Sequence, residues 1–113
     1  MHELSIVEGM MRTVIPAAKK AGAKRIVSIR LKIGDMSGVI PSCVEEYFSL
    51  VSPGTMAEGA KLVMEPVPVT ISCPACGYAG PVKRGEWKCP QCAGTAYSVT
   101  GGNDFFVDSL EAE

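Results

Sequence analysis

The stretch RIVSIRLKIG, residues 25–34, is the clearest structural signal in the chain, because its side chains alternate as those of a half-buried strand do. One of its two side-chain parities is wholly apolar and comprises Val27, Ile29, Leu31 and Ile33, whereas the other is largely polar. Successive side chains of a strand point to opposite faces of the sheet. We therefore predict a strand whose apolar face packs on a core built by the elements before and after it.

An amphipathic helix is predicted before this strand, over residues 4–21, where apolar side chains recur at helical spacing. Ser5 has the capping-box spacing and is the expected N-cap, and Gly22 is the expected stop. This boundary would leave residues 1–3 just outside the helix. Pro16 lies within the pattern and predicts a kink or a break, because proline removes a helical hydrogen bond and clashes one turn back.

After the strand, a second helix is expected over about 42–52, with Pro41 at its first position. The following stretch, residues 61–71, resembles a strand interrupted by prolines, which is typical of an edge strand or of one that leaves its sheet. DFFVDSLEAE, residues 104–113, is the expected last strand, and we predict that it returns to the first sheet.

This order of elements predicts an α+β fold of 113 residues. The expected architecture is a small mixed sheet of about three strands packed with two helices, plus an inserted lobe resembling a zinc ribbon. Residues 1–70 and 98–113 form the predicted α+β domain, and residues 71–97 form the predicted lobe.

The inserted lobe contains CPACGYAGPVKRGEWKCPQC, in which two CxxC pairs supply Cys73, Cys76, Cys89 and Cys92. Four thiolates on two tight turns match the tetrahedral ligand set of structural Zn(II). Iron in a rubredoxin-like site is the chemical alternative, because it also accepts four thiolates. A four-thiolate site has no open position, so the metal is expected to hold the lobe together.

An alternative function for such a lobe is a zinc-ribbon module that binds nucleic acid or protein without delivering any metal. Lys83, Arg84 and Lys88 make its loop locally basic, but Glu86 lies among them and the net charge of the chain is −1. We therefore expect no nucleic-acid partner. No apolar run approaches the roughly 20 residues that span a bilayer, and no basic leader precedes an apolar stretch. We expect a cytoplasmic protein without a membrane partner.

The chain begins MHEL, and His2 is its single histidine. The α-amine of Met1, the main-chain nitrogen of His2 and an imidazole nitrogen can chelate one ion in fused rings. Cu(II) and Ni(II) favour such square-planar nitrogen sites. Glu3 could add a carboxylate or its own amide. From chemistry alone, a solvated terminal histidine remains the alternative.

Several segments together resemble the HypA/HybF family of nickel metallochaperones for hydrogenase maturation. They are MHELSI at the start, IRLKIGDMSGVIPS (29–42), AEGAKL (57–62) and the two CPxC knuckles. The resemblance covers essentially the whole chain. It implies one Ni(II) held by Met1 through its amine, by His2 and by Glu3.

The same resemblance implies a structural zinc at the four cysteines and makes the α+β domain the nickel-binding domain. It also implies a GTPase partner, HypB, and delivery of nickel to the large subunit of [NiFe]-hydrogenase, with urease as a further client of some members. A metallochaperone is not expected to be an enzyme, and the single terminal histidine leaves no nucleophile–base pair. This chain lacks the second histidine with which some relatives complete the nickel site. Both a monomer and a homodimer remain open.

Overall fold

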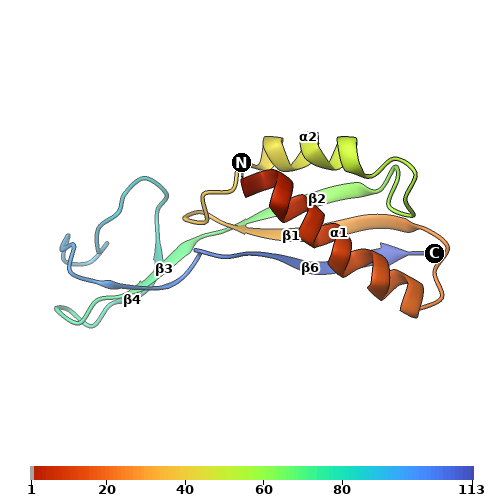
Figure 1. The fold of residues 1–113 in the computed structure, drawn as a ribbon. Coiled ribbons are helices and arrows are strands. Elements are labelled where there is room, and N and C mark those ends of the chain that lie inside the picture. The colour runs from red at the N-terminus through yellow and green to blue at the C-terminus, as the bar shows by residue number, and fades with distance from the viewer. Residues whose placement is uncertain (1) are drawn as a thin grey trace. The chain divides into compact units, whose positions relative to one another are not determined.

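The computed structural model describes residues 2–113, without the side chain of His2, and contains two helices and six strands (Figure 1). The helices are α1 (His2–Lys20) and α2 (Pro41–Val51). The strands are β1 (Ile26–Gly34), β2 (Lys61–Val67), β3 (Val69–Ser72), β4 (Ala79–Val82), β5 (Ser98–Gly101) and β6 (Phe105–Ala112). They form two three-stranded sheets, in the orders β2-β1-β6 and β4-β3-β5.

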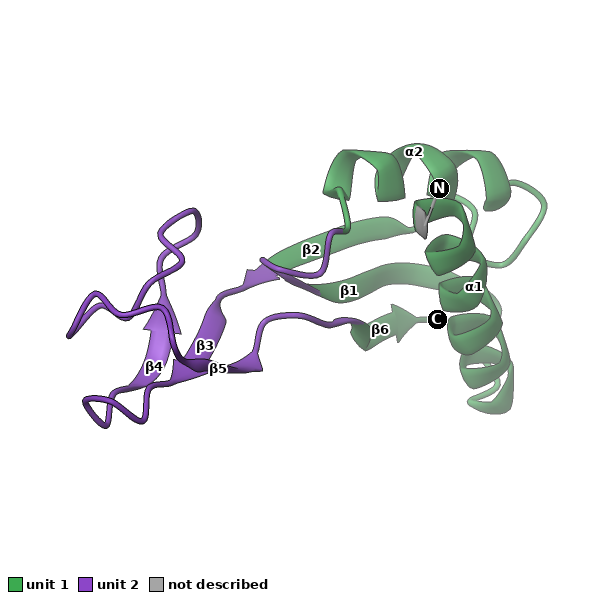
Figure 2. Cartoon of the chain, turned by 60° about the vertical axis from the view of Figure 1, so that its left-hand side comes forward, with its two compact units in different colours: residues 1–32, 39–65, 106–113 green, residues 33–38, 66–105 purple. Residues whose placement is uncertain are grey.

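The chain divides into two compact units, which Figure 2 colours separately. The first unit comprises residues 1–32, 39–65 and 106–113, and it contains both helices. The second comprises residues 33–38 and 66–105, and it contains the four-cysteine segment. The α+β class and the inserted lobe predicted from the sequence are therefore confirmed.

The first sheet is mixed, as predicted. Arg25 and Glu113 exchange both main-chain hydrogen bonds (3.0 and 2.9 Å), and Gly34 N–H donates to Asp104 O (2.8 Å), so β6 runs antiparallel to β1. The last strand thus returns to the first sheet, as expected from the sequence.

The opposite edge of this sheet is β2, which runs parallel to β1. Ile26 N–H donates to Met56 O (2.7 Å) just before β2, and Asp35 N–H donates to Val67 O (2.9 Å) at its end. A parallel pair needs a crossover, and α2 supplies it. The predicted strand 61–71 is divided at Pro68, so that β2 lies at a sheet edge and β3 lies in the second sheet. The interruption expected from the prolines is confirmed.

The burial of β1 follows its sequence alternation only in part. Ile29, Leu31 and Ile33 are buried as predicted, but Val27 is half-buried. Ile26, on the largely polar parity, is 1% exposed. The parity rule therefore fails at the first position of the strand, where Ile26 is also hydrogen-bonded to the segment after α2. The helices bury Val7, Met10, Met11, Val14, Ala18, Val44 and Phe48 against this core.

The start of α1 differs from the prediction. The helix begins at His2, so Ser5 lies inside it rather than at the N-cap, and residues 2 and 3 are helical. A kink or a break is expected at Pro16, and the structure excludes the break, because α1 continues through this residue to Lys20. One missing hydrogen bond costs less here than breaking a helix whose buried stripe includes Val14 and Ala18 on both sides of the proline.

The end of α1 is the predicted one. Gly22 adopts a φ of 78°, its N–H donates to Lys19 O, and Ala23 N–H donates to Ala18 O, both at 3.0 Å. This pair of hydrogen bonds is the Schellman arrangement, which satisfies carbonyls that a helix end leaves unpaired. The second helix, Pro41–Val51, lies within one residue of its predicted bounds.

A charged cluster on the first sheet links β1 to β2. Glu65 accepts hydrogen bonds from Arg30 Nη1 and from Lys32 Nζ, the latter at 2.8 Å. The hydrogen bond from Lys32, followed by that from Arg30, lowers the pKa of Glu65 below 4.5. A carboxylate with a lowered folded-state pKa stabilises the fold above its unfolded pKa, and this contribution disappears as the pH falls through the folded pKa.

We therefore expect Glu65→Gln to lower the urea midpoint at pH 7, and to lower it less at an acidic pH, where the carboxyl becomes protonated in the folded as well as in the unfolded protein. Urea unfolding of both proteins at the two pH values measures this difference. Glu45→Gln is the matched control, because Glu45 is an exposed carboxylate of α2. The same loss of stability for Glu65→Gln at both pH values would show that the ion pairs are not the cause.

Candidate metal centre

The four cysteines predicted to bind metal converge in the second unit. Cys73 and Cys76 lie in the turn between β3 and β4, and Cys89 and Cys92 lie in the segment between β4 and β5. Their four Sγ atoms all lie within 4.8 Å of one another. Over the described residues, no other group of three or more His, Cys, Asp or Glu side chains converges in this way.

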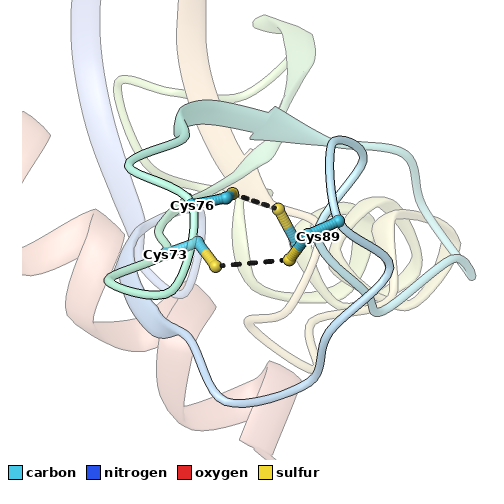
Figure 3. Close-up of side chains that lie close together, drawn as sticks. Cys73, Cys76 and Cys89 are labelled. Atoms are coloured by element: carbon cyan, nitrogen blue, oxygen red, sulfur yellow. Dashed lines mark hydrogen bonds between the residues drawn. The ribbon is translucent and has the colours of Figure 1, made fainter.

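The sulfur–sulfur distances suit one tetrahedral ion. Cys73 Sγ lies 3.7 Å from Cys92 Sγ, and Cys76 Sγ lies 3.5 Å from Cys89 Sγ (Figure 3). A Zn–S bond of about 2.3 Å with tetrahedral angles requires sulfurs about 3.8 Å apart. The cluster therefore has the donor type and the spacing of a four-thiolate metal site.

The two knuckles share one main-chain conformation. In the first, Gly77 N–H donates to Cys73 O (2.8 Å) and Cys73 N–H donates to Tyr78 O (2.8 Å). In the second, Ala93 N–H donates to Cys89 O (2.8 Å) and Cys89 N–H donates to Gly94 O (2.9 Å). Equivalent hydrogen bonds thus place the first cysteine of each pair in the same position.

This conformation explains the residue that follows each knuckle. Gly77 has a φ of 80°, and Ala93 has a φ of 60°, which a side chain with a Cβ disfavours. Ala93 is the one residue other than glycine with a positive φ between residues 2 and 113. The second knuckle therefore keeps the geometry of the first at some cost in backbone strain, although its glycine comes one position later.

Burial and hydrogen bonding separate the pKa values of the thiols. Burial raises the pKa of Cys89, but hydrogen bonds from the main chain of Cys92 and Gln91, together with neighbouring thiols, lower it to about 7. The main chain of Tyr78 lowers the pKa of Cys76, yet burial and the three other thiols raise it to about 12. Four thiolates this close repel one another, so a bound cation is needed to ionise all of them.

The hydrophobic core around the cluster is small. Cys73 and Cys89 are 2% and 1% exposed, and among the described residues the other buried members of this core cluster are Val69, Ile71 and Val82, with Cys76, Tyr78 and Tyr97 partly buried against it. Two of the five core residues are thus metal-ligand candidates. A core of this size is typical of lobes that a metal holds together.

The predicted nickel residues, Met1, His2 and Glu3, are the first three residues of the sequence. Met1 and the side chain of His2 are outside the described residues. The main chain of His2 opens α1, and Glu3 is in its first turn. The first N–H groups of a helix have no intrahelical acceptor, so the helix does not use the main-chain nitrogens of these two residues.

Glu3 has a contact that sequence reasoning missed. Its Oε2 accepts a hydrogen bond from Ile40 N–H (3.3 Å), at the start of α2. The two residues are separated by 37 positions. No local sequence signal connects them, because the contact depends on how α1 and α2 pack.

Comparison with known proteins identifies close relatives. The sequence model of the family described as "Hydrogenase/urease nickel incorporation, metallochaperone, hypA" matches residues 1–112. A protein of Dehalococcoides mccartyi (strain 195) named "Hydrogenase maturation factor HypA" is 38% identical over 113 residues, which cover 100% of this chain and 95% of the relative. A protein of the same name from Geobacter metallireducens is 37% identical, with 100% of both chains covered.

Two solved structures share the fold. The first, "Solution structure of HypA protein", is 25% identical to this chain with a TM-score of 0.73, and the match covers 100% of this chain and 97% of the solved chain. "Solution structure of the Ni metallochaperone HypA from Helicobacter pylori" has a TM-score of 0.68 and 22% identity, with 97% and 96% covered. Neither helix described here is long and apolar enough to cross a membrane.

Proposed function

This chain belongs to the HypA family of metallochaperones for nickel incorporation, and from that membership we propose that it binds Ni(II) at its N-terminus and delivers the ion to the large subunit of [NiFe]-hydrogenase. The match over residues 1–112 carries the proposal, because it includes both the MHE start and the cysteine knuckles. Urease is the proposed second client, and the GTPase HypB is the proposed partner.

The proposed nickel ligands are the α-amine of Met1, the main-chain nitrogen and imidazole of His2, and Glu3. The helical start at His2 supports this site, because first-turn nitrogens are not committed to helical hydrogen bonds. Nitrogen ligands in fused chelate rings suit Ni(II). A site at a chain terminus is also accessible to an acceptor protein, so ligand exchange can pass the ion on.

The proposed metal of the second unit is Zn(II), held by Cys73, Cys76, Cys89 and Cys92. The sulfur spacing and the small core support a structural role. When bound, the ion supplies the positive charge that keeps all four thiols ionised. In this proposal nickel binds to the α+β domain, predicted as residues 1–70 and 98–113, and zinc binds to the lobe of residues 71–97. We further propose a cytoplasmic, non-enzymatic protein without a nucleic-acid partner.

The test is a titration of the untagged protein with Ni(II), with zinc content measured alongside. We expect one nickel per chain beside one retained zinc. The matched variant carries three additional residues, Gly-Ser-Gly, before Met1, which place the α-amine too far from His2 to share fused chelate rings with it and should abolish tight nickel binding.

Unchanged nickel binding in the extended protein would contradict the N-terminal site. A chain that retains zinc but takes up no nickel would contradict metal delivery, and it would favour the zinc-ribbon module that binds another macromolecule. Isothermal calorimetry and metal analysis of the same samples give both quantities.

A further inference from the structure

The N-terminus of α2 lacks the groups that usually cap a helix. Its N-cap residue is Ile40, whose side chain makes no capping hydrogen bond, and Pro41 follows it. The first turn of α2 contains no acidic residue. Helix N-termini favour both a hydrogen-bond acceptor and a negative charge. Within its own sequence, α2 supplies neither of them.

Glu3 of α1 supplies both. Its carboxylate accepts the hydrogen bond from Ile40 N–H at 3.3 Å and places a negative charge at the positive end of the α2 dipole. In a capping box, a Glu at the third helical position reaches back to the N–H of the N-cap residue. That position of α2 is Cys43, which has no carboxylate, so a residue from another helix takes over the role.

This contact joins the proposed nickel site to the body of the first unit. Glu3 directly follows His2, and its hydrogen bond fastens the first turn of α1 to the start of α2. A chain terminus without such an attachment would have to be ordered when the metal binds. Ordering a ligand set in advance raises affinity, because less conformational entropy is lost on binding.

We propose that Glu3 is a positioning residue of the nickel site, whose carboxylate caps α2 rather than coordinating the ion. This role rests on the proposed function, because it concerns the same N-terminal site. Coordination of nickel by the Glu3 carboxylate would draw its negative charge toward the ion and away from Ile40 N–H, which would weaken the cap of α2. The main-chain nitrogen of Glu3 is unaffected by this assignment.

The experiment compares Glu3→Ala with Glu3→Gln in the untagged full chain. Glutamine keeps a carbonyl oxygen that can accept the hydrogen bond from Ile40 N–H, but it lacks the anionic oxygen that a carboxylate ligand requires. Three quantities are measured: the Kd for Ni(II), the ligand-field spectrum of the nickel complex, and the Tm of the nickel-free protein. Glu8→Ala and Glu8→Gln are matched controls, since Glu8 is an exposed carboxylate of the same helix.

We expect Glu3→Ala to weaken nickel binding by about 10- to 100-fold, as for the loss of a residue that orients a metal ligand, and to lower the Tm. Glu3→Gln should restore most of the affinity and of the Tm, and its nickel spectrum should match that of the wild type. If Glu3→Ala does not fold, the comparison of Glu3→Gln with the wild type still decides between the two roles.

Equal losses of affinity in both variants, with an altered spectrum, would overturn the proposal in favour of a carboxylate ligand. Wild-type affinity in Glu3→Ala would also overturn it, because the contact would then have no effect on the site. A wild-type chain that binds no nickel would instead contradict the proposed function. The Tm values of the two nickel-free variants would then still show whether Glu3 caps α2.

Discussion

His2→Ala is expected to abolish tight nickel binding while the fold and the metal of the cysteine cluster are retained. The substitution removes the imidazole and with it the chelate ring that the imidazole and the main-chain nitrogen of residue 2 would close on the ion. Losing a residue that merely orients a ligand already costs about 10- to 100-fold in metal affinity. Losing a ligand should therefore weaken Ni(II) binding by more than about 100-fold, which corresponds to more than about 2.7 kcal/mol.

Calorimetric titration with Ni(II) measures this loss, and zinc analysis of the same samples tests whether the sites are separable. Glu8→Ala is a suitable control, because it alters an exposed residue of the same helix and should bind nickel as the wild type does. Loss of zinc in His2→Ala would show that the two sites depend on each other. Retention of tight nickel binding would move the site elsewhere in the chain.

Cys89→Ser is expected to release the proposed zinc and to unfold the second unit while the first unit stays folded. Cys89 is 1% exposed and belongs to a five-residue core cluster that also contains Cys73. Structural zinc contributes about 10–16 kcal/mol of apparent binding energy in small zinc-dependent folds at neutral pH. The few apolar residues around this cluster cannot replace that contribution.

Metal analysis reports the lost ion, and amide NMR spectra report which unit unfolds. We expect signals of residues 66–105 to collapse toward random-coil positions, and those of β1 and the helices to persist. Cys43→Ser is the matched control, because Cys43 lies on α2 outside the cluster, so its zinc content should be unchanged. Full zinc occupancy in Cys89→Ser, or an ordered second unit without metal, would contradict the structural role.

Much of the fold could be predicted because its signals lie in consecutive residues. The alternation of residues 25–34 identified β1, and Pro41 marked the start of α2. The prolines of residues 61–71 indicated an edge strand or one that leaves its sheet, and the structure divides this stretch between two sheets. The short strands β4 and β5 were not predicted, because four residues are too few for a periodic pattern.

The candidate metal centre was predictable for a similar reason. Two CxxC pairs carry their own turn geometry, so the spacing of Cys73, Cys76, Cys89 and Cys92 indicated that four sulfurs would meet. The left-handed conformation of Ala93 was not predictable from its residue type, because alanine rarely adopts it. It follows from the symmetry between the two knuckles that the sulfur cluster imposes.

Local sequence signals were enough for the central strand, the two helices and the convergence of four thiols, while the terminal histidine stays a predicted nickel ligand. Tertiary structure alone decided where α1 begins, that it continues through Pro16, and that Glu3 reaches Ile40. The difference comes from how far apart in the sequence the interacting residues are. Periodicity and ligand spacing act between near neighbours, whereas the start of a helix also depends on contacts with residues remote in the chain.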